Sequence, residues 1–146
     1  MQLTSDRLRY LIDKIHAGVV VIDNDNKIVL FNELAGEMLN QDPKSRIGTS
    51  ILLCHPERAE PGVLKMIDQM KTGELKEYEG WVNFAGRVLY EYIYPLHDEG
   101  GNYIGAVGEM HDAPEKAEYL KTKGEFEMPE MHGLEESAPR SPHAED

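Results

Sequence analysis

The sequence predicts an α+β domain with a five-stranded antiparallel sheet, helices on one sheet face and an N-terminal amphipathic helix. Three features support this fold class: two β-branched runs separated by a turn near residue 25, a helical segment near residue 67, and three strand-like segments before residue 113. A hairpin, then helices, then three more strands places the helices across one face of a small sheet and forms a cup.

A short helix opens the chain. Residues 4–16 carry an apolar stripe at helical spacing, and charged residues occupy the other side. Thr4 or Ser5 can cap its start. One apolar stripe on a short terminal helix must pack on the sheet of the same chain or on a second copy. We expect it to form a homodimer interface through Leu8, Leu11, Ile12 and Ile15.

The next segments predict a hairpin and two helices. Residues 19–22 and 27–31 are β-branched or aromatic, and the Asp/Asn cluster between them is typical of a turn. Asn32 caps a helix that runs to about Leu39. After a polar loop, residues 63–71 have helical spacing, and Gly73 ends that helix.

The last three strands are predicted within EYEGWVNF, RVLYEYIY and NYIGAVGEMHD. In the middle segment, Tyr90 and Tyr92 share one face, and Glu91 lies on the other between two apolar residues. One of these faces lines the cup. Tyr90, Tyr92 and Trp81 are the preferred pocket residues, because phenol and indole groups offer hydrogen bonds to a planar ligand. An ordinary aromatic sheet face is the alternative.

Composition limits the classes of function. The chain has 146 residues and a net charge of −12, which predicts one domain without affinity for nucleic acid or anionic lipid. A single cysteine excludes an internal disulfide and a four-cysteine metal site. No apolar run reaches the roughly 18–20 residues of a membrane span, so we expect a soluble, cytoplasmic protein.

Three regions are expected along the chain. Residues 1–17 form the N-terminal helix and residues 18–112 form the main domain. Residues 113–146 form a short helix followed by an acidic tail that is too polar to build a core, which predicts disorder.

Over residues 5–112 the sequence resembles a PAS domain, through GVVVID, IVLFNELAGEML, RIGTSILLCHPE, KTGE and YPLHDEGGNYIGAVGEMHD. It looks closest to a bacterial PAS subgroup often joined to hemerythrin-like domains. The resemblance implies a cup that binds haem, flavin, a small metabolite or nothing. It also implies dimerisation through the N-terminal helix and signalling to a kinase, cyclase or DNA-binding domain. The usual Asp-Ile-Thr ending is Asp112-Ala113-Pro114 here, and no output domain follows, so we expect signalling to a separate protein in trans.

Candidate ligands for iron lie in the Cys54-His55-Pro56 segment (the CHP segment) and in the helix expected after it. Imidazole, thiolate and thioether groups can hold haem iron, so haem b is a candidate cofactor with His55 as the candidate iron ligand. The other candidates for ligand or cofactor contact are Cys54, Met66 and Met70. Against this, His-Pro is typical of a turn, a buried cysteine is a small hydrophobe, and paired methionines fill cores. The haem-binding oxygen sensors of the family take a histidine from the start of the long helix, where this chain has EPGV.

No catalytic motif or paired-carboxylate arrangement is present, so an enzyme is not expected. The predicted function is a stand-alone PAS sensory module that binds a small molecule or cofactor in its cup and signals through a partner protein. Two alternatives stay open. One is a haem-binding gas or redox sensor, and the other is a protein-interaction adaptor with a filled core.

Overall fold

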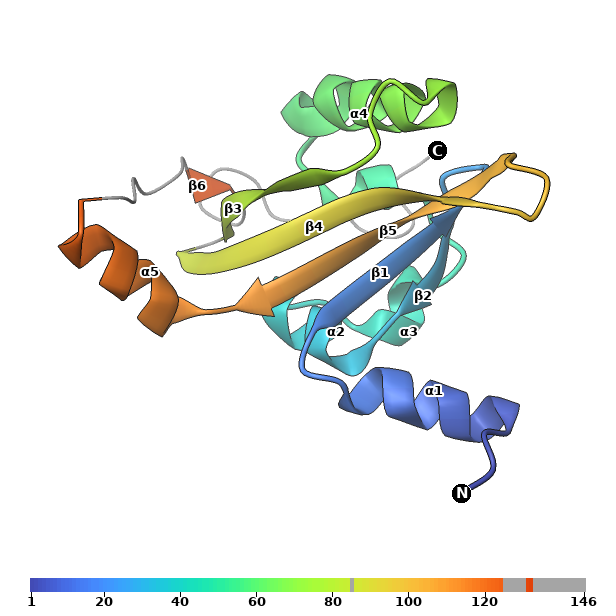
Figure 1. Ribbon diagram of the computed structural model, residues 1–146, viewed down its shortest axis with the longest axis horizontal. Coiled ribbons are helices and arrows are strands. Elements are labelled where there is room, and N and C mark those ends of the chain that lie inside the picture. The colour runs from blue at the N-terminus through green and yellow to red at the C-terminus, as the bar shows by residue number, and fades with distance from the viewer. Residues whose placement is uncertain (85, 125–130, 133–146) are drawn as a thin grey trace.

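The computed structural model describes residues 1–84, 86–124 and 131–132 (Figure 1). The helical elements are α1 (Ser5–Lys14), α2 (Glu33–Leu39), α3 (Pro43–Arg46), the 3-10 helices η1 (Ile51–Cys54) and η2 (Glu57–Ala59), α4 (Glu60–Thr72) and α5 (Pro114–Thr122). The strands are β1 (Gly18–Asp23), β2 (Ile28–Phe31), β3 (Tyr78–Phe84), β4 (Arg87–His97), β5 (Tyr103–Asp112) and β6 (Met131–His132).

One sheet organises the domain, in the strand order β2-β1-β5-β4-β3-β6. The first five strands pair antiparallel, which confirms the predicted α+β sheet. The sixth strand has only two residues and pairs parallel with β3 at the sheet edge. It lies in the region for which we expected a disordered tail. The rest of that tail, residues 125–130 and 133–146, lies outside the described residues.

The predicted hairpin is present, and its turn is built from its own side chains. The Asp23 carboxylate accepts hydrogen bonds from the backbone N–H groups of Asp25, at 2.8 Å, and Lys27, at 3.0 Å. Asn26 takes the left-handed conformation with φ of 63°, which asparagine tolerates better than most residues. This turn chemistry fixes the register of β1 against β2.

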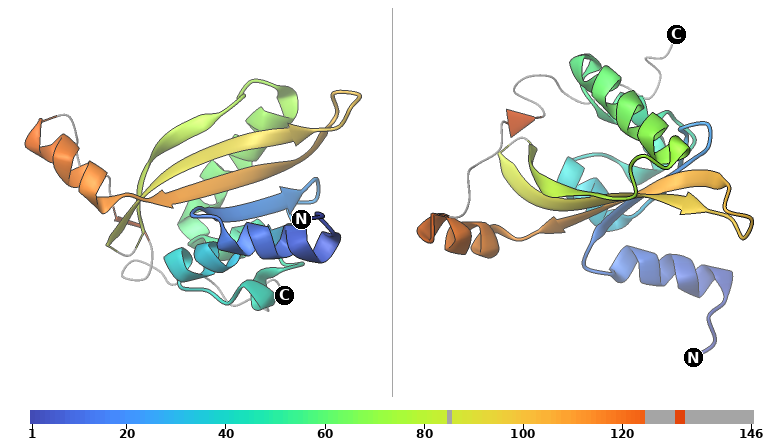
Figure 2. Two further views of the ribbon diagram at one scale, coloured as in Figure 1. Left: turned by 60° about the horizontal axis from the view of Figure 1, so that its bottom comes forward. Right: turned by 45° about the horizontal axis from the view of Figure 1, so that its top comes forward.

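The long helix α4 lies across one face of the sheet, whereas α1 lies beside α2 and away from α4 (Figures 1 and 2). The helix begins at Glu60, three residues earlier than the sequence predicts. Pro61 is compatible with this start, because a proline in the first helical turn removes an N–H that has no partner inside the helix. Gly73 ends the helix in the left-handed conformation, as predicted.

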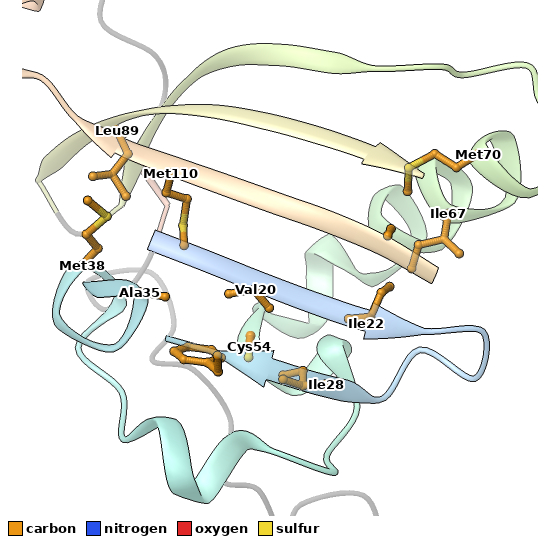
Figure 3. Packing of buried hydrophobic residues seen from close by; sticks show 12 residues of the cluster. Val20, Ile22, Ile28, Ala35, Met38, Cys54, Ile67, Met70, Leu89 and Met110 are labelled. Carbon is orange, nitrogen blue, oxygen red and sulfur yellow. The ribbon is translucent and has the colours of Figure 1, made fainter. Parts of the chain in front are cut away.

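The core lies between the helices α2 and α4, the segment η1 and the sheet face that they cover (Figure 3). Its buried cluster contains Val20, Ile22, Ile28, Phe31, Ala35, Met38, Cys54, Ile67, Met70, Leu89, Ala106 and Met110. Among the described residues, no helix combines the length and apolar character that crossing a bilayer requires.

Candidate functional site

A cavity of about 530 Å³ opens between α4 and the inner face of the sheet. Its walls come from the strands β1 to β5, the helices α2 and α4, and the segment from η1 to η2. Most of its lining side chains are aliphatic, aromatic or methionine. Small-molecule sites typically have volumes of roughly 300–1,000 Å³ and this mainly apolar character.

The CHP segment lines the cavity at the C-terminal end of η1. His55 is half-buried and lines the cavity wall. Its backbone is extended, with φ of −120° and ψ of 153°, which the following Pro56 favours. The CHP segment therefore connects η1 to η2 and at the same time places His55 in the cavity wall.

Cys54 lines the same cavity as a buried thiol. Its thiol is buried and donates a hydrogen bond to Gln41 Oε1, with 3.6 Å between sulfur and oxygen. Burial raises the pKa of Cys54 to about 11, and nearby Arg46 only partly opposes this shift. The sulfur is thus a neutral thiol at neutral pH in the absence of a metal ion.

Both candidate methionines face the cavity from α4. Met66 is partly buried, whereas Met70 is 1% exposed and belongs to the core cluster. Their i, i+4 spacing places them on one helical face, together with Val63 and Ile67. The structure therefore brings His55, Cys54, Met66 and Met70 to one cavity from two segments of the chain.

Strand β4 presents the opposite face to the cavity from the one preferred in the sequence analysis. Leu89, Glu91 and Ile93 line the cavity, and Leu89 is 0% exposed. Alternation along the strand then directs Tyr90 and Tyr92 to the other side of the sheet. The prediction that Tyr90, Tyr92 and Trp81 line the cup is therefore wrong, since none of them lines the cavity.

On that outer face the aromatic side chains pack edge to face. Ring centroids are 4.8 Å apart for Trp81 and Tyr90, 5.3 Å for Tyr90 and Tyr92, and 5.9 Å for Tyr92 and His111. A hydrogen bond from the Tyr90 hydroxyl to the Glu79 carboxylate raises the pKa of Tyr90 to about 12. These contacts indicate an aromatic sheet face whose phenols stay protonated, the alternative that the sequence left open.

Glu91 is the site residue that the sequence analysis did not select. It lies on the cavity wall opposite Gly80 of β3 and Met110 of β5. Within the described part of the chain, no group donates a hydrogen bond to its carboxylate or forms an ion pair with it. Desolvation raises the pKa of Glu91 from 4.5 to about 7. The available signal was the single charge on an otherwise apolar strand face.

The residues predicted to form a dimer interface lie on α1 and at Ile15, the residue that caps its C-terminal end, apart from the cavity. None of the α1 residues is buried, and Leu8 and Ile15 are 46% and 45% exposed. Throughout the described residues, no group of three or more His, Cys, Asp and Glu side chains is placed to hold a metal ion.

Comparison with known proteins agrees with this architecture. Residues 8–113 match the family described as PAS domain. The chain is 27% identical over 135 residues to the alginate biosynthesis sensor protein KinB of Pseudomonas aeruginosa, covering 88% of this chain and 22% of KinB. It therefore spans about a fifth of the length of this curated relative.

Two solved structures share the fold. A C-terminal domain from Streptococcus mutans has a TM-score of 0.68 at 19% identity, covering 80% of this chain and 90% of that one. The histidine kinase ThkA, solved in complex with the response regulator TrrA, has a TM-score of 0.64 at 15% identity, covering 78% of this chain and 33% of that one. With most of its length matched by the family and its cup-shaped sheet in place, the chain belongs to the PAS domain family.

Proposed function

We propose that this PAS domain is a sensory module that binds a small molecule or cofactor in its cavity and signals through a separate partner protein. The observation that carries the proposal is the cavity of about 530 Å³, which is bounded by α4 and the sheet. A hollow of this size favours ligand binding over an adaptor whose core is filled by its own side chains. Similarity to KinB, a sensor protein, supports the same class of function.

Signalling requires that the ligand favour one of two arrangements of the domain. The cavity walls belong to α4 and to strands that continue into both terminal helices: β1 follows α1, and β5 leads into α5 (Figure 1). A ligand that changes the packing of α4 on the sheet can therefore shift α1 or α5, because each of these helices is joined directly to a strand of the cavity wall. We further propose that α1 pairs with a second copy through its apolar stripe.

Native mass spectrometry of the freshly purified full chain tests ligand binding. We expect an occupied fraction with added mass, which is lost in Met66→Trp because an indole at this position fills part of the cavity. Leu64→Trp is the matched control, since Leu64 lies on the same helix but is 38% exposed and outside the cavity lining. Equal occupancy of the two variants, or no added mass in the parent chain, would contradict the proposal.

A haem-binding sensor is the second candidate, because His55 and Met66 line one cavity from different elements. Imidazole and thioether side chains are both axial ligands of haem iron. If haem binds, His55 from the end of η1 and Met66 or Met70 from α4 would hold the iron.

Absorption spectra after adding haemin distinguish the second candidate from the first. A haem sensor should show a sharp Soret band that His55→Ala abolishes or shifts. Met66→Ala should alter the same band if the thioether is the second axial ligand. A spectrum that His55→Ala, Met66→Ala and Met70→Ala all leave unchanged would remove the haem hypothesis and leave binding of other small molecules intact.

A further inference from the structure

Among the residues that the structure describes, one carboxylate lies on the sheet wall of the cavity, and none of the others pairs with it. Glu91 projects from β4 between two apolar neighbours, Leu89 and Ile93. A carboxylate in such surroundings is costly unless a hydrogen-bond donor or a cation compensates it. None of the described residues supplies that compensation. A ligand that carries a donor or a cation would therefore meet, in this cavity, an acceptor that no described residue occupies.

The groups around Glu91 indicate which chemistry the occupant brings. On β3, Gly80 lies opposite Glu91, and the Tyr78 side chain covers it: a Cβ at Gly80 would lie 2.7 Å from the Tyr78 hydroxyl oxygen. The charge of Glu91 contributes to raising the pKa of Tyr78, after the larger effect of burial. Tyr78 is therefore a neutral phenol beside the carboxyl and does not neutralise it.

The other elements around the cavity add few charges. From β5, Gly108 and Met110 line the wall, and α4 contributes apolar residues and Gly62. The titratable or charged groups on the remaining wall are Cys54, His55 and Arg58, on the segment before α4. Cys54 is neutral, and Arg58 is exposed at the edge of the cavity. The sheet wall thus offers one anionic group, and the part of a ligand that lies against the sheet and α4 must otherwise be apolar.

We propose that Glu91 is the recognition residue of this cavity and that its ligand is a small apolar molecule carrying one primary amine. This inference rests on the proposed ligand-binding function and names the class of ligand. An ammonium group supplies both the positive charge and the hydrogen-bond donors that an ionised carboxylate accepts. The aliphatic and methionine walls would enclose the hydrocarbon part.

Calorimetric titration of the full chain with hexylamine, hexan-1-ol and hexanoate tests the inference. At pH 8 we expect hexylamine to bind at least about tenfold more tightly than hexan-1-ol, and hexanoate to bind most weakly. Glu91→Gln should reduce hexylamine affinity to that of the alcohol. The control is Glu109→Gln, the same change on the neighbouring strand β5, where Glu109 pairs with Tyr92 of the outer face. This variant should still bind hexylamine more tightly than hexan-1-ol.

The pH dependence has a defined sign. Binding of the ammonium requires ionised Glu91, so hexylamine affinity should rise with pH and be about tenfold weaker at pH 6 than at pH 8. Hexan-1-ol should not show this rise. If Glu91→Gln fails to fold, carboxyl carbon NMR of the parent chain provides the test: saturating hexylamine should lower the pKa of Glu91 by more than about one unit.

The outcomes separate the two proposals. Equal affinity of amine and alcohol, tightest binding of hexanoate, or a preference that survives Glu91→Gln would overturn the role of Glu91 while leaving ligand binding in the cavity supported. Binding of none of the three probes, with no occupant in native mass spectrometry, would overturn both.

Discussion

A carboxyl group on an apolar wall costs folding free energy whenever it is ionised. Because burial raises the pKa of Glu91 to about 7, the folded chain binds its proton more tightly than the unfolded chain, where the value is about 4.5. Between these pH values the folded state therefore holds more protons, and this residue lowers the free energy of unfolding as pH rises. Below about pH 4.5 both states are protonated and the effect vanishes.

We expect Glu91→Gln to stabilise the fold by about 1–3 kcal/mol at pH 8 and by almost nothing at pH 4.5. Urea unfolding of variant and parent at each pH measures the difference between their free energies of unfolding. Groups other than Glu91 titrate alike in both proteins, so their contributions cancel in this difference. Glu109→Gln serves as control for removing one negative charge. An equal gain at both pH values would show that Glu91 is not the group responsible.

Gly105 is a position where the close approach of another strand's backbone requires glycine. A Cβ built there would lie 2.1 Å from the carbonyl oxygen of Ile22 on β1, which is backbone and has little freedom to yield. We expect Gly105→Ala to destabilise the fold by about 2–3 kcal/mol. Gly62→Ala is the control, because its Cβ meets nothing within 4 Å and alanine favours the helix. Thermal melting of both variants measures these effects, and a similar melting temperature for the two would contradict the steric argument.

At the scale of elements, one buried side chain joins α1 to the sheet and to α2. Asn32 is 1% exposed, and its amide oxygen accepts from Val19 N at 2.8 Å and Ala35 N at 3.0 Å. Its amide nitrogen donates to Ile12 O at 2.9 Å and Ala17 O at 2.8 Å. The donor side thus holds the end of α1, and the acceptor side holds β1 and caps α2.

Replacing the amide separates these two functions. Asn32→Asp keeps the acceptor oxygen but loses the donor to Ile12 and Ala17, so we expect α1 to lose protection in hydrogen exchange while α4 keeps most of its protection. Asn32→Ala removes both and should destabilise the whole domain by about 2–4 kcal/mol. Unchanged protection of α1 in Asn32→Asp would show that other contacts hold the helix.

At the scale of the whole molecule, the apolar stripe of α1 remains partly uncovered by its own chain. If a second copy covers it, charges placed on the stripe should dissociate the dimer, because two buried carboxylates without partners cost several kcal/mol. We expect Leu11→Glu with Ile15→Glu to lower the sedimentation coefficient to that of a monomer. The control is Leu64→Glu with Ile104→Glu, which adds the same charge at exposed apolar positions outside α1. A dimer that survives the α1 substitutions would contradict this interface.

Much of the fold could be predicted from the sequence because the responsible interactions are local. The Asp23 turn and the Asn32 cap both act over a few residues, and each is present as expected. The candidate site was harder, because its lining comes from segments far apart in the chain. His55, Cys54, Met66 and Met70 do line one cavity, whereas the outer-face aromatics do not.

The sequence by itself determined the order of strands and helices, the turn and cap chemistry, and the membership of two alternating sets of residues in β4. Only the tertiary structure decided which set lies inside. Alternation defines two faces of a strand but carries no information on which face another element covers. Helix α4 covers the face of Leu89, Glu91 and Ile93, and for that reason the cavity received a carboxyl group instead of the phenols of Tyr90 and Tyr92.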